Sequence, residues 1–399
     1  MRTITFRTAL AVSLLQAGSV AAQPEPEDPA AGAPAHPDPA AVTPEVAPVA
    51  VTEPTAVASA EDPPHGEAEA ADASLIKLSG HVAATYNYNL MKPAGGVTPF
   101  HSYTAPHNTF LLNQAHLAVT GSDDKFAYAV EIDAGTDAFL NTYLSPVGPS
   151  YFDIQEAYVS YTAASGLGFK AGKFVTYNGI EVIESPANPT ISRGFLFGLA
   201  EPATNVGALG TYKISDTLDV ALGAVSGWDL IVDNNDNKTI VAKLGVTKEK
   251  LGLVISSYAG KETNNTDWRA TLDATAVIKM AKMDLWLQAN VGFEEGVAAM
   301  GEDGMWMGFG VQPVMRIDDK LSLCGRVEAF LDGDGARTGA EQTLINVSVA
   351  PAYKVHERVT IRAEARLDFS SEDVFQSDDA TADPGAMQVI GLTEAAVTF

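Results

Sequence analysis

The sequence is poor in cysteine and in basic residues. Cys324 is the only cysteine among 399 residues, so neither an internal disulfide nor a cysteine-based metal cluster can form. The 25 Lys and Arg residues stand against 50 Asp and Glu, a net charge of -25, and so acidic a surface repels nucleic acid. Beyond the amino-terminal segment, no apolar run approaches the roughly 18 residues that a membrane-spanning helix needs. These absences exclude a disulfide scaffold, a nucleic-acid partner and a helical membrane protein.

The first 22 residues are typical of a secretory signal peptide. Arg2 and Arg7 supply the charged region, residues 8–15 form the apolar core, and Ala22 completes a small-residue cleavage site. Residues 23–72 then contain 11 of the 22 prolines and 11 acidic residues, but no Lys or Arg. This composition predicts a disordered Pro/Ala/Glu-rich arm, which lies in the periplasm after export. The arm is either an inert spacer or a contact for the cell wall or a periplasmic partner.

Residues 73–399 are dominated by a period of two, as in β-strands. Every second residue from Val359 to Phe369 is apolar, and the positions between include Arg362, Glu364, Arg366 and Asp368. In a soluble sandwich the apolar side would face the core. In a membrane barrel the apolar side faces lipid and the polar side faces the lumen.

Connection lengths distinguish these two architectures. We predict sixteen strands, at 75–90, 108–121, 125–134, 152–163, 167–178, 204–214, 217–228, 238–248, 251–261, 267–280, 283–293, 305–317, 321–331, 342–354, 359–370 and 387–399. Long connections and short turns alternate along this series. The Greek-key topology of a sandwich does not require such alternation. The alternation favours an all-β, transmembrane, up-and-down antiparallel β-barrel of about 16 strands, with periplasmic turns, extracellular loops and both termini in the periplasm.

The last strand carries a separate signal. Ala395, Val397 and the terminal Phe399 share one face, and this pattern resembles the carboxy-terminal signature by which bacterial outer-membrane barrels are recognised for assembly. Phe399 is therefore the predicted assembly signal. We expect the barrel-assembly machinery and outer-membrane lipid as partners.

Several motifs resemble those of a known family. They are Gly172-Lys173-Phe174, residues 179–184, Asn188-Pro189, Ser192-Arg193, residues 195–198, Pro202, Gly227-Trp228-Asp229 and residues 233–236. Together they resemble the beta-barrel porin-2 family, the OmpL-like outer-membrane porins of Gram-negative bacteria. The resemblance implies an outer-membrane channel and brings no catalytic or ligand residues with it. Barrels of this size also resemble families that are often trimeric, so a homotrimer is one expectation.

A barrel of sixteen strands is too wide for its own side chains to fill, and it leaves an aqueous channel. We therefore expect passive diffusion of ions and small polar solutes. Placing apolar residues outward predicts a lumen-facing set of His81, Glu131, Asp133, Arg269, Asp273, Arg326, Glu328, Arg362, Glu364, Arg366 and Asp368. Opposite charges two residues apart would pair along or across strands. Such ladders either stiffen and hydrate the wall or create a transverse field.

The long connection 179–203 is the candidate pore constriction. It carries the charged residues Glu181, Glu184, Arg193 and Glu201 together with the aromatic residues Phe195 and Phe197. Apolar residues in a loop need a surface to pack against, which would be the inner wall or a neighbouring subunit. Three roles stay open: a pore constriction, a subunit latch and a surface lid. If the loop enters the lumen, we expect Arg193 to pair with a carboxylate.

The long loops with their flanking strand ends hold 21 acidic residues against about five basic ones. A channel mouth with an excess of negative charge concentrates cations, so the sequence predicts a weak preference for cations. Solubility and bridging to surface lipid through divalent ions is the alternative role. The acidic runs 233–237 and 332–335 lack the ligand spacing of an EF-hand loop, and we expect no metal site and no cofactor.

An enzyme and a non-conducting barrel are the rival functions. The sequence has neither a Gly-x-Ser-x-Gly elbow nor a His-Glu-x-x-His motif, so we do not expect an enzyme. His81 and His116 face the lumen on adjacent predicted strands, where neutral hydrogen-bonded imidazoles are expected. A structural or adhesive barrel closed by its loops remains the alternative to a channel.

Overall fold

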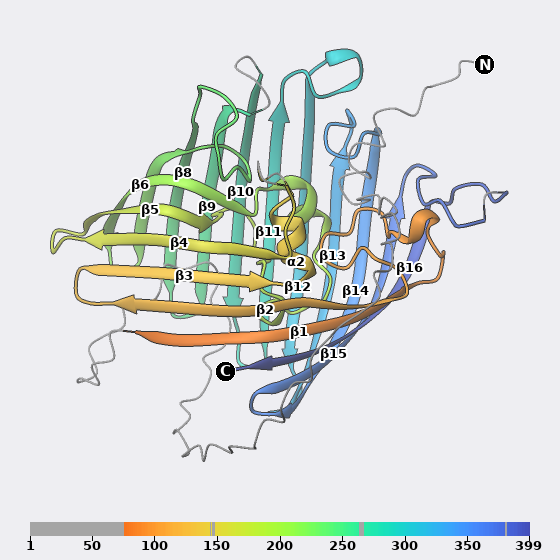
Figure 1. Ribbon diagram of the computed structural model, residues 1–399, viewed down its shortest axis with the longest axis horizontal. Coiled ribbons are helices and arrows are strands. Elements are labelled where there is room, and N and C mark those ends of the chain that lie inside the picture. The colour runs from red at the N-terminus through yellow and green to blue at the C-terminus, as the bar shows by residue number, and fades with distance from the viewer. Residues whose placement is uncertain (1–75, 144, 146–147, 263–266, 380) are drawn as a thin grey trace, which may run out of the picture.

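The computed structural model describes residues 76–143, 145, 148–262, 267–379 and 381–399. They form one closed barrel in which every strand pairs antiparallel with its neighbours in the chain, and the first strand pairs with the last (Figure 1). The sixteen-stranded up-and-down barrel that the sequence predicts is confirmed. The predicted signal peptide and the predicted arm lie outside the described residues.

The strands are β1 (Lys77–Asn89), β2 (Thr109–Ser122), β3 (Phe126–Ala134), β4 (Phe152–Thr162), β5 (Leu167–Val175), β6 (Thr204–Ser215), β7 (Leu218–Val225), β8 (Thr239–Lys248), β9 (Leu251–Lys261), β10 (Trp268–Lys279), β11 (Met283–Glu294), β12 (Gly304–Arg316), β13 (Leu321–Asp332), β14 (Gln342–His356), β15 (Val359–Ser370) and β16 (Met387–Thr398). Short helices occupy the long connections: η1 (Ala94–Gly96), α2 (Thr136–Asn141), η2 (Ser185–Ala187), η3 (Leu196–Ala200) and η4 (Ala299–Gly301). Within the described part of the chain, no helix has the length and hydrophobicity to cross a bilayer.

Two predicted strands end earlier than expected. The strand predicted at 167–178 ends at Val175, because the following backbone turns away to bond across the barrel: the Tyr177 amide donates to the Tyr258 hydroxyl at 3.0 Å. The strand predicted at 217–228 ends at Val225 for a similar reason, since the Trp228 amide donates to Glu262 at 2.7 Å. Alternation in the sequence continues past the point where the strand ladder stops.

The two faces of the wall have the polarity of a membrane barrel. On β15, Ile361 is 49% exposed on the outer face, whereas Arg362, Glu364, Arg366 and Asp368 are each at most 4% exposed on the inner face. Large apolar side chains are exposed along the other strands too, for example Phe110, Leu222 and Phe309. An outer surface this apolar is stable only against lipid, so the chain presents the wall of a transmembrane barrel.

The seam between β1 and β16 closes at the short-turn end. The amides of Gly80 and Phe399 each donate to the carbonyl of the other residue at 2.9 Å. The Phe399 ring lies so close that a Cβ on Gly80 would come within 2.7 Å of it. Phe399 therefore extends the strand pairing that closes the barrel, in addition to its predicted part in assembly.

Candidate functional site

Residues 179–203 lie inside the barrel. The Gly179 amide donates to Asp273 on β10, the Ser185 amide to Gln114 on β2, and the Leu196 amide to Glu328 on β13. Further contacts reach β11, β12, β15 and β16. A segment that bonds to strands around so much of the circumference must cross the lumen. The hypothesis of a plain surface lid does not fit this geometry.

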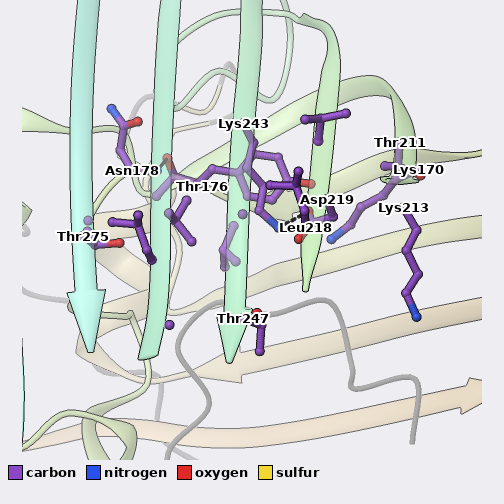
Figure 2. Close-up of a pocket in the computed structure, with 18 of the residues that line it drawn as sticks. Lys170, Thr176, Asn178, Thr211, Lys213, Leu218, Asp219, Lys243, Thr247 and Thr275 are labelled. Atoms are coloured by element: carbon purple, nitrogen blue, oxygen red, sulfur yellow. Dashed lines mark hydrogen bonds and ion pairs between the residues drawn. The ribbon is translucent and has the colours of Figure 1, made fainter. Parts of the chain in front are cut away.

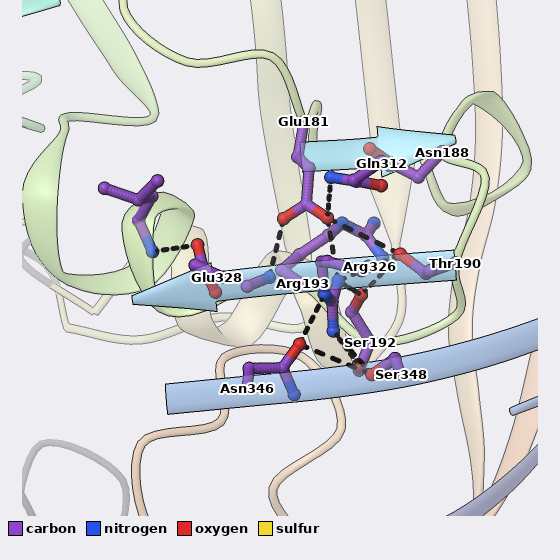
Figure 3. A network of polar contacts seen from close by, with 12 residues as sticks. Glu181, Asn188, Thr190, Ser192, Arg193, Gln312, Arg326, Glu328, Asn346 and Ser348 are labelled. Carbon is purple, nitrogen blue, oxygen red and sulfur yellow. Dashed lines mark hydrogen bonds and ion pairs between the residues drawn. The ribbon is translucent and has the colours of Figure 1, made fainter. Parts of the chain in front are cut away.

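Arg326 on β13 is the centre of the polar network between loop and wall (Figure 3). Its guanidinium donates to Glu181 at 2.8 Å, to the Thr190 hydroxyl at 2.9 Å and to the Ser192 carbonyl at 2.7 Å. The Nε atom donates to Asn346 on β14 at 2.7 Å, and the side chain is only 1% exposed. One buried cation thus ties three loop residues to two neighbouring strands.

Two wall carboxylates bind the loop through its backbone. Glu328 accepts the amides of Phe195 and Leu196 at 2.6 and 2.7 Å. Glu364 accepts the amides of Ile191 and Ser192, each at 2.8 Å. Because these bonds involve main-chain donors, they fix the path of the loop and satisfy polar groups that would otherwise be buried without partners.

The arginines of β15 complete the anchorage. Arg362 donates to the Ser185 carbonyl at 2.9 Å and forms an ion pair with Glu394 across the strand boundary. Arg366 donates to the Arg193 carbonyl at 2.6 Å and pairs with Asp368, two residues along the same strand, at 2.7 Å. Opposite charges thus pair both along and across strands, as the spacing of charges predicts.

The prediction that Arg193 pairs with a carboxylate is wrong. The Arg193 guanidinium donates to the carbonyls of Val182, Ile183 and Ile191 within its own loop, and it lies 5.2 Å from the ring of Tyr103. Arg193 therefore folds the loop onto itself and does not bind it to the wall through a carboxylate.

The loop carboxylates have other donors, which explains this result. Glu181 binds Arg326, Glu184 accepts from Gln155, and Glu201 accepts from Gln288 at 2.7 Å. Burial, followed by the neighbouring Asp273 carboxylate, raises the pKa of Glu201 well above its ordinary value. The position of Arg193 among backbone carbonyls cannot be read from residue spacing.

The aromatic residues of the loop pack inside the barrel. Phe195 and Leu196 join a buried cluster with Trp306 and Phe330 of the wall. Phe197 packs with Tyr103 and Ile183 in a second cluster. The inner wall supplies apolar surface for Phe195 and Leu196, and Tyr103 of the 91–107 loop supplies part of it for Phe197.

The remaining predicted lumen residues lie elsewhere on the inner wall. His81 and His116 stack with their ring centroids 4.8 Å apart. His81 bonds Gln114 at 3.0 Å, while His116 contacts Asp133 at 2.9 Å and Glu131 at 3.6 Å. On the opposite wall, Arg269 pairs with Glu294 at 2.6 Å and Asp273 accepts from Asn290 at 2.9 Å. Two of these groups also reach the loop, because Gln114 accepts from the Ser185 amide and Asp273 accepts from the Gly179 amide.

Sequence reasoning missed several residues that hold the loop. Glu394 bonds both Arg362 and Ser185, but its inward face on β16 also carries Ile390 and Leu392, so polarity does not reveal the orientation. Gln114 accepts from the Ser185 amide at 2.8 Å. Gln114 stands two residues before His116 on the same strand, and this spacing indicates that its side chain points inward. The spacing does not indicate that Gln114 bonds to Ser185.

A cavity of about 340 Å³ remains between residues 177–183 and the inner wall from β3 to β10 (Figure 2). Residues 215–217, which include the turn between β6 and β7, form part of its rim. Lys170, Lys213 and Lys243 line it, and the sequence analysis identified none of these lysines as site residues. The loop therefore packs against the far wall and leaves space on this side.

Solved structures with the same fold are bacterial outer-membrane proteins. An anion-selective porin from Comamonas acidovorans aligns with a TM-score of 0.57 and 10% identity over 81% of this chain and 99% of its own. The outer-membrane channel DcaP of Acinetobacter baumannii gives a TM-score of 0.56 and 11% identity over 81% and 97%. OmpT of Vibrio cholerae gives 0.54 and 13% over 84% and 100%. At these identities the likeness shows the fold alone.

The sequence itself matches no curated protein. It does match the family model described as "Putative beta-barrel porin-2, OmpL-like" over residues 75–399, which includes every strand of the barrel and the loop that crosses it. The match extends well beyond residues 172–236, which contain the family motifs named in the sequence analysis. The chain belongs to the beta-barrel porin-2 family of OmpL-like porins and is an outer-membrane channel.

Proposed function

We propose that the channel carries ions and small polar solutes by passive diffusion and that residues 179–203 form its constriction. The observation that supports this role is the anchorage of the loop to the inner wall by Arg326, Glu328, Arg362 and Glu364. A segment held across the lumen reduces the cross-section open to solutes. Family and fold point to a channel rather than to an enzyme.

The acidic mouth gives the channel a weak preference for cations. Glu302, Asp303, Asp334, Glu372 and Asp373 are exposed in the long loops. Fixed charges of one sign raise the local concentration of counter-ions. Because exposed charges are screened over about 10 Å at 0.1 M salt, this preference weakens as ionic strength rises.

A non-conducting structural or adhesive barrel is the second candidate. The buried cluster around Phe195 and Trp306 favours it, because this cluster fills part of the lumen with apolar side chains. The channel and the plugged barrel differ in whether ions cross.

Planar-bilayer recording under a KCl gradient tests the proposal. We expect stable conductance steps and a reversal potential of cation-selective sign at low salt, which decreases at high salt. A barrel that assembles but gives no steady conductance would support the structural alternative. A reversal potential of anion-selective sign would refute the cation preference while leaving the channel in place.

We also propose that the chain is exported by a signal peptide, keeps its arm in the periplasm, is recognised for assembly through Phe399 and forms a homotrimer. A trimer form of Vibrio cholerae OmpT is among the similar structures, which supports the last point by fold alone. Chemical cross-linking of the protein in native membranes tests it. A ladder ending at three copies is expected, and monomers alone would contradict the trimer.

A further inference from the structure

The cavity beside the loop has the size of a small-molecule site. Its volume of about 340 Å³ lies within the range of roughly 300–1,000 Å³ typical of such pockets. The inward loop bounds it on one side and strands β3 to β10 bound it on the other (Figure 2). Within the described residues, none of its lining comes from β11 to β16, which include the strands of Arg326, Arg362 and Glu364. The cavity is therefore separate from the wall side chains that anchor the loop.

The charged groups that line the cavity balance one another. Three lysines stand against three carboxylates in its lining: Lys170, Lys213, Lys243, Glu181, Asp216 and Asp219. Lys243 pairs with Asp219 at 3.1 Å, and Lys213 pairs with Asp216 at 3.2 Å. The Glu181 carboxylate is bound by Arg326 at 2.8 Å. A charged solute would have to separate an existing ion pair or lose hydration without gaining a counter-charge, whereas a neutral solute avoids both costs.

Threonine hydroxyl groups line the same space. Figure 2 shows Thr211 on β6 and Thr275 on β10 at two sides of the cavity. Within the described part of the chain, no side-chain hydrogen bond occupies either hydroxyl. A hydroxyl group both donates and accepts hydrogen bonds, as the hydroxyl groups of a sugar do. The Asp219–Lys243 pair adds further acceptors and donors, because neither group uses all its hydrogen-bonding capacity on one partner.

The cavity also has apolar walls. Ile180 and Phe197 of the loop line it on one side, and Val254 and Val277 of the strands line it on the other. A hydrated inorganic ion gains nothing from such walls, whereas the C–H groups of a sugar ring bury apolar surface against them. The combination of free hydroxyl groups, balanced charges and apolar walls suits a neutral solute that carries several hydroxyl groups on a carbon ring.

We propose that this cavity binds a neutral polyhydroxylated solute, a small sugar or polyol, with its hydroxyl groups at Thr211, Thr275 and the Asp219–Lys243 pair and its carbon face against Ile180. This inference names a solute class for the channel and rests on the proposed function, which gives the solute its route. The cavity reaches the turn end through residues 215–217, whereas the acidic loops lie at the opposite end of the strands. Because the solute carries no net charge, the acidic loops do not repel it.

Three sugars with the same pyranose ring test the charge requirement. Glucose is neutral, glucuronate is negative, and glucosamine is positive at mildly acidic pH. Binding is measured by saturation-transfer NMR on the protein in a zwitterionic detergent, because detergents with sugar heads would compete for the site. We expect saturable binding of glucose, about tenfold tighter than that of either charged sugar, since a charge that loses hydration without a partner weakens binding.

Threonine variants test the assignment of the site. Thr211→Val and Thr275→Val keep the shape of the side chain and remove the hydroxyl group, and each is expected to weaken glucose binding about fivefold, the loss of one hydrogen bond. Thr275→Ser restores the hydroxyl group and should restore the affinity. Thr360→Val is the matched control, because Thr360 is half-buried on β15 and does not line the cavity. Its affinity for glucose should equal that of the unaltered protein.

Two results would overturn the inference. One is glucose binding to the unaltered protein that is absent or no tighter than that of the charged sugars, which requires no variant to fold. The other is unchanged glucose affinity in both valine variants. The NMR measurement gives these answers whether or not the barrel conducts. A missing conductance therefore counts against the channel, and missing or unselective glucose binding counts against the sugar site.

Discussion

Replacing Arg326 by Met should release the loop from the wall. The substitution keeps the length and apolar stem of the side chain but removes the donor to Glu181, Thr190 and Ser192. Glu181 and Glu364 would then remain buried without their shared cation. Removing one partner from a buried ion pair costs about 3–5 kcal/mol.

This free-energy cost shifts the equilibrium between docked and undocked loop, because undocking removes most of the cost. When the loop leaves the wall, water reaches both carboxylates and most of the penalty is recovered. Since each 1.4 kcal/mol is a factor of ten, the ratio of undocked to docked loop should rise by about 10² to 10³. Single-channel recordings should then show a second, larger conductance level that the unaltered protein rarely visits.

Arg316→Met is the matched control for this experiment. Arg316 pairs with Asp284 at 2.7 Å, but its side chain is 45% exposed and it is the last residue of β12. An exposed pair contributes about 0–1 kcal/mol, so any effect on the loop should stay below about fivefold. If Arg326→Met assembles and shows the same single conductance level as the control, the ion-pair network does not hold the loop.

Three further outcomes follow from the structure. Unboiled protein should migrate differently from boiled protein on a denaturing gel, because a closed barrel has no free strand edge. Gly80→Val should weaken this difference, because its Cβ would come within 2.4 Å of the His116 carbonyl oxygen on β2 and within 2.7 Å of the Phe399 ring. His101 of the 91–107 loop is buried against Asp368, and burial, followed by Arg366, lowers its pKa to about 4. Neutral His101 therefore holds the 91–107 loop in place fully above about pH 6.5, and this contribution is lost as pH falls towards 4. Limited proteolysis of the 91–107 loop should accelerate over that interval, and a His101→Asn variant that keeps the same acceleration would refute the assignment. Arg193→Lys should increase current noise through the loosened loop without changing the reversal potential, and a shifted reversal potential would contradict its bonding to carbonyls.

The architecture could be predicted because barrel geometry leaves a regular trace in the sequence. Alternating polarity on β15 indicates that the face with Arg362 and Glu364 points inward. The lengths of the connections indicate which of them are turns and which are loops. These signals are local or depend only on distance along the chain. They carry no information about which lumen groups meet across the barrel.

The site was predicted only in part for that reason. Residues 179–203 were identified by length and composition, but the partners of Arg193 depend on how the loop folds onto its own carbonyls. Lys170 and Lys243 were missed because a single lysine in a strand gives no sign of a cavity beside it. Side chains on β5 and β8 line one cavity because the wall curves through β6 and β7 between them, which pairwise spacing does not encode.

The central claim is that residues 179–203 set the resistance of the channel. Deleting residues 185–198 removes the part of the loop bound by Arg362, Glu364 and Glu328, and leaves those groups in contact with water. Because the narrowest section dominates resistances in series, the single-channel conductance of the deletion variant should exceed that of the unaltered protein. An unchanged conductance in a variant that still shows the heat-dependent gel shift of an assembled barrel would contradict the claim.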